Sequence, residues 1–207
     1  MYKYLFIIII LISLSISSND ELLDILYNED GWELSDVLDD NSSIYFKDVD
    51  NIDLKAIKIS KDLDINPQKV LDTIKDVKKY NDVLKNSPYL VTTPLIDNDK
   101  ILAKHHISVP IFSDLYYFFR IFEEQNKVYW LLQDPKIYNN EKKSGYALST
   151  GCGGWDYTEN KDGTYKISYT LIFDIDTYPN WIVNYLNYYS LLNVYNDVIR
   201  AAKNKVS

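Results

Sequence analysis

Hydrophobic and polar residues alternate with a period of two along much of the chain after residue 88, which is the pattern of half-buried β-strands. Short groups of turn-forming residues divide this part of the chain into predicted strands. These strands are Tyr89–Ile96, Lys100–Val109, Leu115–Glu123, Lys127–Gln133, Gly145–Thr158 and Thr164–Ile175. Strands joined by short turns must pair antiparallel. The resulting sheet is predicted to have one apolar face and one wet face.

The first third of the chain has a mixed pattern that predicts short helices and two further strands. Proline suits the first position of a helix, so Pro67 is predicted to begin one whose apolar face runs to Val77. The other predicted elements are a helix over about Asp20–Asn28, strands at Ile44–Phe46 and Leu54–Ile59, and a short helix over about Lys78–Leu84.

The last segment predicts a long amphipathic helix that begins just after Pro179. Its apolar residues recur three or four positions apart and therefore share one broad face. They are Trp181, Ile182, Tyr185, Leu186, Tyr189, Leu192, Tyr195 and Ile199. This face is predicted to lie on the sheet. Because Trp and Tyr have polar tips that need partners, it is also predicted to cover something other than plain core.

Composition limits the classes of protein that the chain can belong to. The 207 residues are enough for one domain with a sizeable core, and the order of elements predicts a single α+β domain. A formal net charge of −8 argues against nucleic acid as a partner and against electrostatic docking on anionic lipid. Cys152 is the only cysteine, so we expect no internal disulfide.

The N-terminus has the features of a secretory leader. Lys3 precedes a nearly continuous apolar run from Tyr4 to Ile16, which is too short to span a bilayer comfortably. Small residues at Ser15 and Ser17 predict cleavage after Ser17, which assigns 1–17 to a signal peptide and 20–207 to the folded domain. The alternative is an uncleaved short anchor. In both cases we expect the domain to be secreted, periplasmic or in the lumen of the secretory pathway.

The inward face of the predicted sheet has features of a ligand cavity. His105 falls on the apolar face of its strand, and Ala103, Gly151 and Gly153 are small enough to leave room there. Tyr hydroxyls on this face would orient a bound molecule. The alternative interpretation is that the glycines only allow the strands to bend and that His105 and the tyrosines are ordinary core.

Candidate catalytic and metal-binding groups are few. Cys152 lies among glycines, but a nucleophile elbow needs a strand-to-helix turn, and this segment is predicted to run from strand to strand. His105 and His106 are adjacent on one strand, so they point to opposite faces and cannot share a metal ion. We therefore expect no catalytic residue, no metal and no cofactor.

Four groups of residues together resemble one known family. They are Trp32 with Ile44–Lys47; Asn66–Val70 with Ile74–Val77 and Tyr80-Asn81; the proline-centred turn Val109–Asp114; and Asp174–Asn184 before and into the last helix. The chain resembles the START domains (steroidogenic-acute-regulatory-protein-related lipid transfer) of the Bet v 1-like, helix-grip superfamily, over about Asp20 to Lys203. Leu115-Tyr116 stand where the family often has Arg-Asp, and Asp176–Tyr178 where it usually has glycines. The family's polar ligand contacts therefore do not transfer.

The resemblance implies an α+β helix-grip fold, in which a curved antiparallel sheet wraps around a long C-terminal helix. It implies a START-like lipid-binding or lipid-transfer protein rather than an enzyme, with a hydrophobic small molecule or lipid as partner. We expect a monomer, transient membrane contact and no nucleic acid. Alternation and helix phase predict the ligand-binding residues His105, Trp130, Tyr146, Tyr169, Tyr185 and Tyr189. Two alternatives stay open: a cyclase- or hydrolase-like enzyme acting on a hydrophobic substrate, and an interaction domain with a filled interior.

Overall fold

The computed structural model describes residues 18–49, 54–87, 90–97, 99–108, 114–138, 145–175 and 177–205. The predicted leader, residues 1–17, and residues 109–113 of the proline-centred turn lie outside the described residues. No helix in the described ranges is long and apolar enough to cross a membrane.

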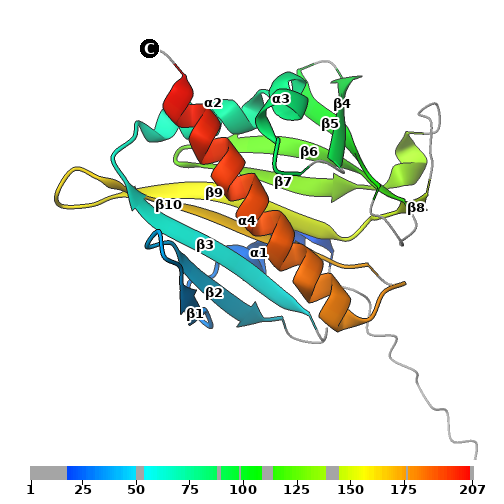
Figure 1. Ribbon diagram of the computed structural model, residues 1–207. Coiled ribbons are helices and arrows are strands. Elements are labelled where there is room, and N and C mark those ends of the chain that lie inside the picture. Colours follow the sequence, from blue (N-terminus) through cyan, green and yellow to red (C-terminus); the bar gives the residue numbers. More distant parts are fainter. Residues whose placement is uncertain are drawn as a thin grey trace, which may run out of the picture.

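The described strands form one curved sheet (Figure 1). Their order is β1-β2-β3-β10-β9-β7-β6-β5-β4, and all neighbours in this path are antiparallel. β8 lies outside this strand order and pairs with β6 in parallel. The bounds are β1 Glu33–Val37, β2 Ser43–Asp48, β3 Lys55–Leu63, β4 Leu90–Asp97, β5 Lys100–Ile107, β6 Leu115–Glu124, β7 Lys127–Gln133, β8 Tyr146–Ala147, β9 Gly151–Glu159 and β10 Tyr165–Phe173.

The sheet curves around the long helix α4, which spans Asn180–Asn204 and crosses its concave side (Figure 1). α4 packs against β3 and β10, and also against α2 (Pro67–Lys75) and α3 (Tyr80–Val83). α1 (Asn19–Tyr27) packs on the opposite face, against β7, β9 and β10. Two 3-10 helices, η1 (Val77–Lys79) and η2 (Pro135–Ile137), lie in the connections. This arrangement confirms the predicted α+β helix-grip fold.

Local sequence signals explain where the first two α-helices begin. The Ser18 hydroxyl accepts a hydrogen bond from the Glu21 backbone N–H at 3.3 Å, and the Glu21 carboxylate accepts one from the Ser18 N–H at 2.9 Å. These reciprocal bonds form a capping box. Asn66 caps α2 by accepting from the Gln68 N–H at 2.9 Å, and Pro67 occupies the first position of that helix.

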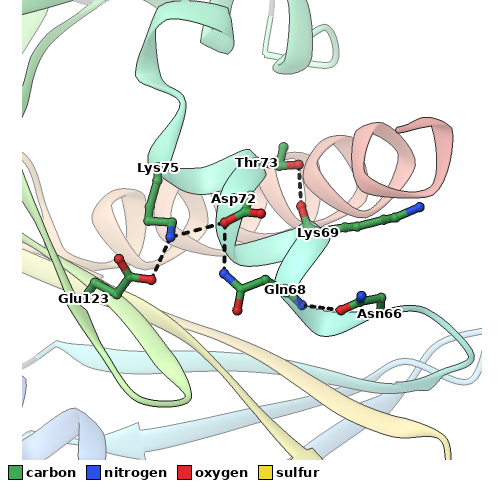
Figure 2. Close-up of polar contacts among 7 residues, drawn as sticks. All are labelled: Asn66, Gln68, Lys69, Asp72, Thr73, Lys75 and Glu123. Carbon is green, nitrogen blue, oxygen red and sulfur yellow. Dashed lines mark hydrogen bonds and ion pairs between the residues drawn. The ribbon is translucent and has the colours of Figure 1, made fainter. Parts of the chain in front are cut away.

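Polar contacts hold α2 against the sheet, as Figure 2 shows. The Lys75 ammonium lies 2.6 Å from the Glu123 carboxylate of β6 and 3.2 Å from the Asp72 carboxylate on its own helix. Gln68 donates a further hydrogen bond to Asp72 at 2.9 Å. Lys75 thus lies on the side of α2 that meets β6, while the neighbouring Ile74 is buried in the core.

The centre of the sheet is buried on both faces, so the prediction of a wet face is wrong there. Ser168, Thr170 and Ile172 of β10 belong to the face that was predicted to be wet, and all three are buried. α1 covers this face and buries its own Leu22 and Leu26 against it. The outer helix therefore adds a second apolar layer to the domain.

Two further strand predictions need correction. The predicted strand Gly145–Thr158 divides into β8 and β9, and the parallel pairing of β8 with β6 departs from the all-antiparallel sheet that was expected. β1 was not predicted, because every one of its side chains is exposed and its sequence lacks an apolar alternation. The turn at Asn160–Gly163 lies between two of the predicted strands, and Gly163 there adopts the positive φ of 83° that such a turn favours.

The inward face of α4 differs from the aromatic stripe that was predicted. Its buried residues are Val183, Asn187, Leu191, Tyr195, Asp197, Val198, Ile199 and Ala202. Tyr195 and Ile199 of the predicted stripe are among them. Trp181, Tyr185 and Tyr189 are 73%, 64% and 49% exposed, respectively. The prediction is therefore wrong for Trp181 and Tyr185, which face mostly outward, whereas Leu186 and Leu192 of the predicted stripe are partly buried against the core.

Candidate ligand-binding site

Two adjoining cavities lie between the concave side of the sheet and α4. The inner cavity has a volume of about 60 Å³ and the outer cavity about 120 Å³. Both are lined by Ser87, Leu90, Tyr117, Phe173 and Ser190, so the two spaces are separated by the same few side chains. We treat them as one candidate site with an inner and an outer compartment.

The inner cavity is lined mainly by aromatic side chains from the sheet. His105 of β5 and Tyr117 of β6 lie directly opposite one another in the antiparallel register. Their side chains are joined by a hydrogen bond of 2.7 Å between the His105 Nδ1 and the Tyr117 hydroxyl. The Phe119 ring contacts the imidazole with 4.5 Å between centroids, and Tyr80 lies at 5.9 Å. The histidine is thus surrounded by rings.

The far wall of the inner cavity is formed by stacked rings. Trp130 stacks on Phe173 with 4.9 Å between centroids. Trp155 stacks on Tyr169 at 4.4 Å, and its other contact is with Tyr195 of α4 at 5.4 Å. The Trp155 ring thereby joins the sheet to the second half of the helix.

Burial keeps the titratable groups of the inner cavity uncharged. Desolvation lowers the pKa of His105 to about 3, so its imidazole is neutral at physiological pH. Desolvation also raises the pKa values of Tyr80, Tyr117 and Tyr169 well above their ordinary value, so these phenols keep their protons. Among the described residues that line either cavity, none is Asp, Glu, Lys or Arg. The site therefore suits an uncharged, largely apolar molecule.

The outer cavity is more apolar and lies beneath the first half of α4. Ile107, Leu115, Leu148 and Ile175 line it from the sheet side, and Leu186 lines it from the helix. Tyr189 also lines this cavity while remaining half exposed, so its ring lies between the cavity and solvent. Asn187 is buried there, and its side-chain amide donates to the Phe173 carbonyl at 3.1 Å.

A buried carboxylate ties the loop beside both cavities to α4. Asp197 is fully buried and accepts hydrogen bonds from the Asn86 backbone N–H at 2.7 Å and from the Asn86 side-chain amide at 2.8 Å. The Asp197 carboxylate also forms an ion pair with the Arg200 guanidinium at 2.7 Å. The same guanidinium donates a hydrogen bond to the Val83 carbonyl at 3.1 Å. Since Ser87 lines both cavities, this network fixes one edge of the site.

The structure brings some of the predicted ligand-binding residues together and leaves others apart. His105, Trp130 and Tyr169 line the inner cavity, and Tyr189 lines the outer one. Tyr146 is partly buried in β8 and Tyr185 is exposed on α4, and neither is among the lining residues. Contact of all six with a ligand stays a prediction.

Sequence reasoning missed several residues of the site and misread the room that glycine makes. Tyr117 and Phe119 belong to an apolar run without alternation, so nothing in the sequence showed which of its residues point inward. A Cβ at Gly153 would lie 2.6 Å from the Trp130 ring and 2.6 Å from the Thr170 carbonyl oxygen. The space left by this glycine is therefore filled by Trp130, not by the cavity.

An antiparallel sheet closed over one long C-terminal helix, with cavities between them, defines a helix-grip protein. The structure is similar to a STAR-related lipid transfer protein from Xanthomonas axonopodis, with a TM-score of 0.65 and 14% identity over 84% of this chain and 99% of that chain. Human STARD10 matches with a TM-score of 0.65 and 13% identity over 91% of this chain and 80% of that chain. An aromatase/cyclase from a Streptomyces species matches with a TM-score of 0.50 and 11% identity over 73% of this chain and 95% of that chain.

These similarities show that the chain has the fold of the START domains, as the sequence motifs predicted. No protein-family model matches the sequence, and no curated protein matches it at a significant level. The fold is therefore recognised from three-dimensional structure at identities of 11–14%.

Proposed function

We propose that the protein binds an uncharged apolar molecule or lipid between the sheet and α4 and carries it without chemical change. The observation that supports this most directly is the pair of adjoining cavities, whose described lining is mainly aromatic and aliphatic and contains no charged side chain. Lipid transfer proteins share the fold. Each 100 Å² of apolar ligand surface removed from water contributes about 2.5 kcal/mol to binding.

Ligand binding requires the site to expand. The inner and outer cavities, at about 60 and 120 Å³, are smaller than the roughly 300–1,000 Å³ of typical small-molecule pockets. The first half of α4 and the loop that carries Ser87 form the outer boundary, and their displacement enlarges the site. Such movements of helices and loops commonly admit a ligand and then enclose it.

Native mass spectrometry of the purified protein, followed by organic extraction, tests the proposal. We expect a co-purified apolar molecule, or a gain in melting temperature when fatty alcohols, sterols, fatty acids or phospholipids are added. Ser190→Phe places a ring where both cavities meet and should abolish binding. Asn196→Phe introduces the same ring at an exposed position of the same helix and should leave binding unchanged. Wild-type protein that neither carries nor gains stability from any of these molecules would refute the proposal.

The alternative function is catalysis on a hydrophobic substrate, and the observation that favours it is the His105–Tyr117 pair beside the inner cavity. General acid–base chemistry needs groups that exchange a proton near neutral pH. Burial moves the pKa values of both groups away from neutrality, which favours binding over catalysis. Recovery of a bound ligand with changed mass after incubation with wild-type protein, but not with His105→Phe, would support the enzyme.

A further inference from the structure

His105 has one ring nitrogen without a hydrogen-bond partner in the described structure. The side chain is 7% exposed, and its Nδ1 is bonded to the Tyr117 hydroxyl at 2.7 Å. The other nitrogen, Nε2, is buried and makes no hydrogen bond, although the residue lines the inner cavity. Buried polar atoms are nearly always paired, so an unpaired nitrogen beside a cavity indicates a partner that is not part of the chain.

The hydrogen bond to Tyr117 determines what the free nitrogen can offer. A neutral imidazole carries one N–H donor and one acceptor nitrogen. If the Tyr117 O–H donates to Nδ1, the phenol is satisfied and Nε2 carries the proton. If Nδ1 donates instead, both the phenol proton and Nε2 are left without partners. The first arrangement leaves fewer buried groups unpaired, so Nε2–H is a donor.

We infer that the inner cavity binds the single uncharged oxygen of an otherwise apolar ligand, which accepts a hydrogen bond from His105 Nε2–H. The oxygen belongs to a hydroxyl or to a ketone or ester carbonyl. This inference rests on the proposed function, because it names the polar group of the molecule that the same site would carry.

The surroundings of His105 exclude a charged head group. Its ring neighbours Tyr80, Tyr117 and Phe119 are all buried and uncharged. No described lining residue of either cavity is a cation that could pair with a carboxylate or a phosphate. An ionised group would have to leave water without compensation, and the cost of that transfer disfavours it. A hydroxyl or carbonyl needs only one donor, which Nε2–H supplies.

A matched series of ten-carbon ligands tests this inference: decane, decanol, the corresponding ketone and decanoate. Trp130 and Trp155 line the inner cavity, so quenching of their fluorescence reports binding. We expect decanol and the ketone to bind about tenfold more tightly than decane, as one buried hydrogen bond provides, and decanoate to bind more weakly than decanol. His105→Phe should abolish the preference for the alcohol over decane while decane still binds.

His106→Phe is the matched control, because His106 is adjacent to His105 on the same strand and therefore lies on its other face, where its Nε2 is 3.2 Å from the Asp114 carboxylate. This variant should keep the wild-type preference for decanol over decane. Because the chain has two histidines, the signals that it loses in nitrogen-15 spectra belong to His106, and the remaining histidine signals belong to His105. In the wild type, decanol should shift the His105 Nε2 resonance and decane should not. This measurement needs no His105 variant, so it decides the question even if His105→Phe fails to fold.

The results distinguish the proposed binding of apolar molecules from the inferred role of His105. Wild-type protein that binds none of the four ligands would count against the proposed function itself. Equal affinity for decane and decanol, or tighter binding of decanoate, would overturn the hydroxyl or carbonyl subsite and leave apolar binding intact. A preference for decanol that survives in His105→Phe would likewise overturn the role of His105.

Discussion

Replacing Asp197 should loosen the edge of the ligand site and destabilise the fold together. In Asp197→Ala the backbone and side-chain donors of Asn86 lose their acceptor, and the Arg200 guanidinium loses its ion pair. Removing one member of a buried ion pair costs about 3–5 kcal/mol. Arg200 is 44% exposed, so water recovers part of this cost. We therefore expect the free energy of unfolding to fall by about 2–4 kcal/mol.

Urea unfolding measures this loss, and Asp48→Ala is the matched control. Asp48 forms an ion pair with Lys55 at 3.0 Å, but its side chain is 82% exposed. Exposed pairs of this kind contribute roughly 0–1 kcal/mol. If Asp197→Ala and Asp48→Ala lower the free energy of unfolding by the same amount, the Asp197 network does not stabilise the fold as the structure indicates.

The same variant tests whether the Asn86–Ser87 loop controls ligand release. Loss of the Asp197 bonds makes local opening of the loop easier, and each 1.4 kcal/mol of that change corresponds to about a tenfold increase in the population of the open state. Stopped-flow dissociation of a bound fatty alcohol should therefore be at least about tenfold faster in Asp197→Ala. A destabilised variant with an unchanged dissociation rate would show that the ligand leaves by another route.

Three further predictions follow from other parts of the molecule. Burial raises the pKa of Asp156 to about 6, so the free energy of unfolding should fall as pH rises from about 4 to 6. Asp156→Asn should therefore raise the free energy of unfolding at pH 7.5 by up to about 3 kcal/mol in urea unfolding, with little effect near pH 4, and an equal effect at both pH values would contradict this reasoning. A Cβ at Gly154 would lie 2.0 Å from the Tyr27 hydroxyl, so Gly154→Ala should lower the free energy of unfolding in urea by about 1–3 kcal/mol. Adding Tyr27→Phe removes that hydroxyl and should restore part of the loss, and a double variant with no restoration would contradict the packing of α1 on β9. Replacing the exposed Trp181 and Tyr185 by alanine should reduce sedimentation with phosphatidylcholine vesicles several-fold without changing the melting temperature; unchanged sedimentation would argue against membrane contact through α4.

The start signals of helices and the turns could be predicted from the sequence because they depend on neighbouring residues. Pro67 after a capping Asn66 is sufficient to begin α2, and Gly163 is sufficient to close the hairpin before β10. Cross-strand partners depend on residues far apart in the sequence. The pairing of β8 with β6 is such a case, since nothing within Tyr146–Ala147 specifies a parallel neighbour.

The candidate site was predicted only where one face of a strand is clearly more polar than the other. His105 lies between Lys104 and His106, so its inward direction could be read from alternation. Tyr117 lies in the run Leu115–Phe119, where side chains on both faces are buried, and its hydrogen bond with His105 could not be foreseen. In β10 the polar residues Ser168 and Thr170 predicted a wet face, but α1 covers that face, and a contact between segments so far apart cannot be read from the strand's own sequence.

The first half of α4 shows why hydrophobicity alone did not determine its orientation. Residues 180–196 contain no charged side chain, so the sequence does not mark an outward face. The buried positions include Asn187, whose amide satisfies the Phe173 carbonyl, while the larger and more apolar Trp181 faces solvent. An interior position of a helix can favour a small amide that pairs a buried carbonyl over an indole that does not fit. The same half of α4 therefore combines an inner side that lines the outer cavity with an outer side of exposed rings.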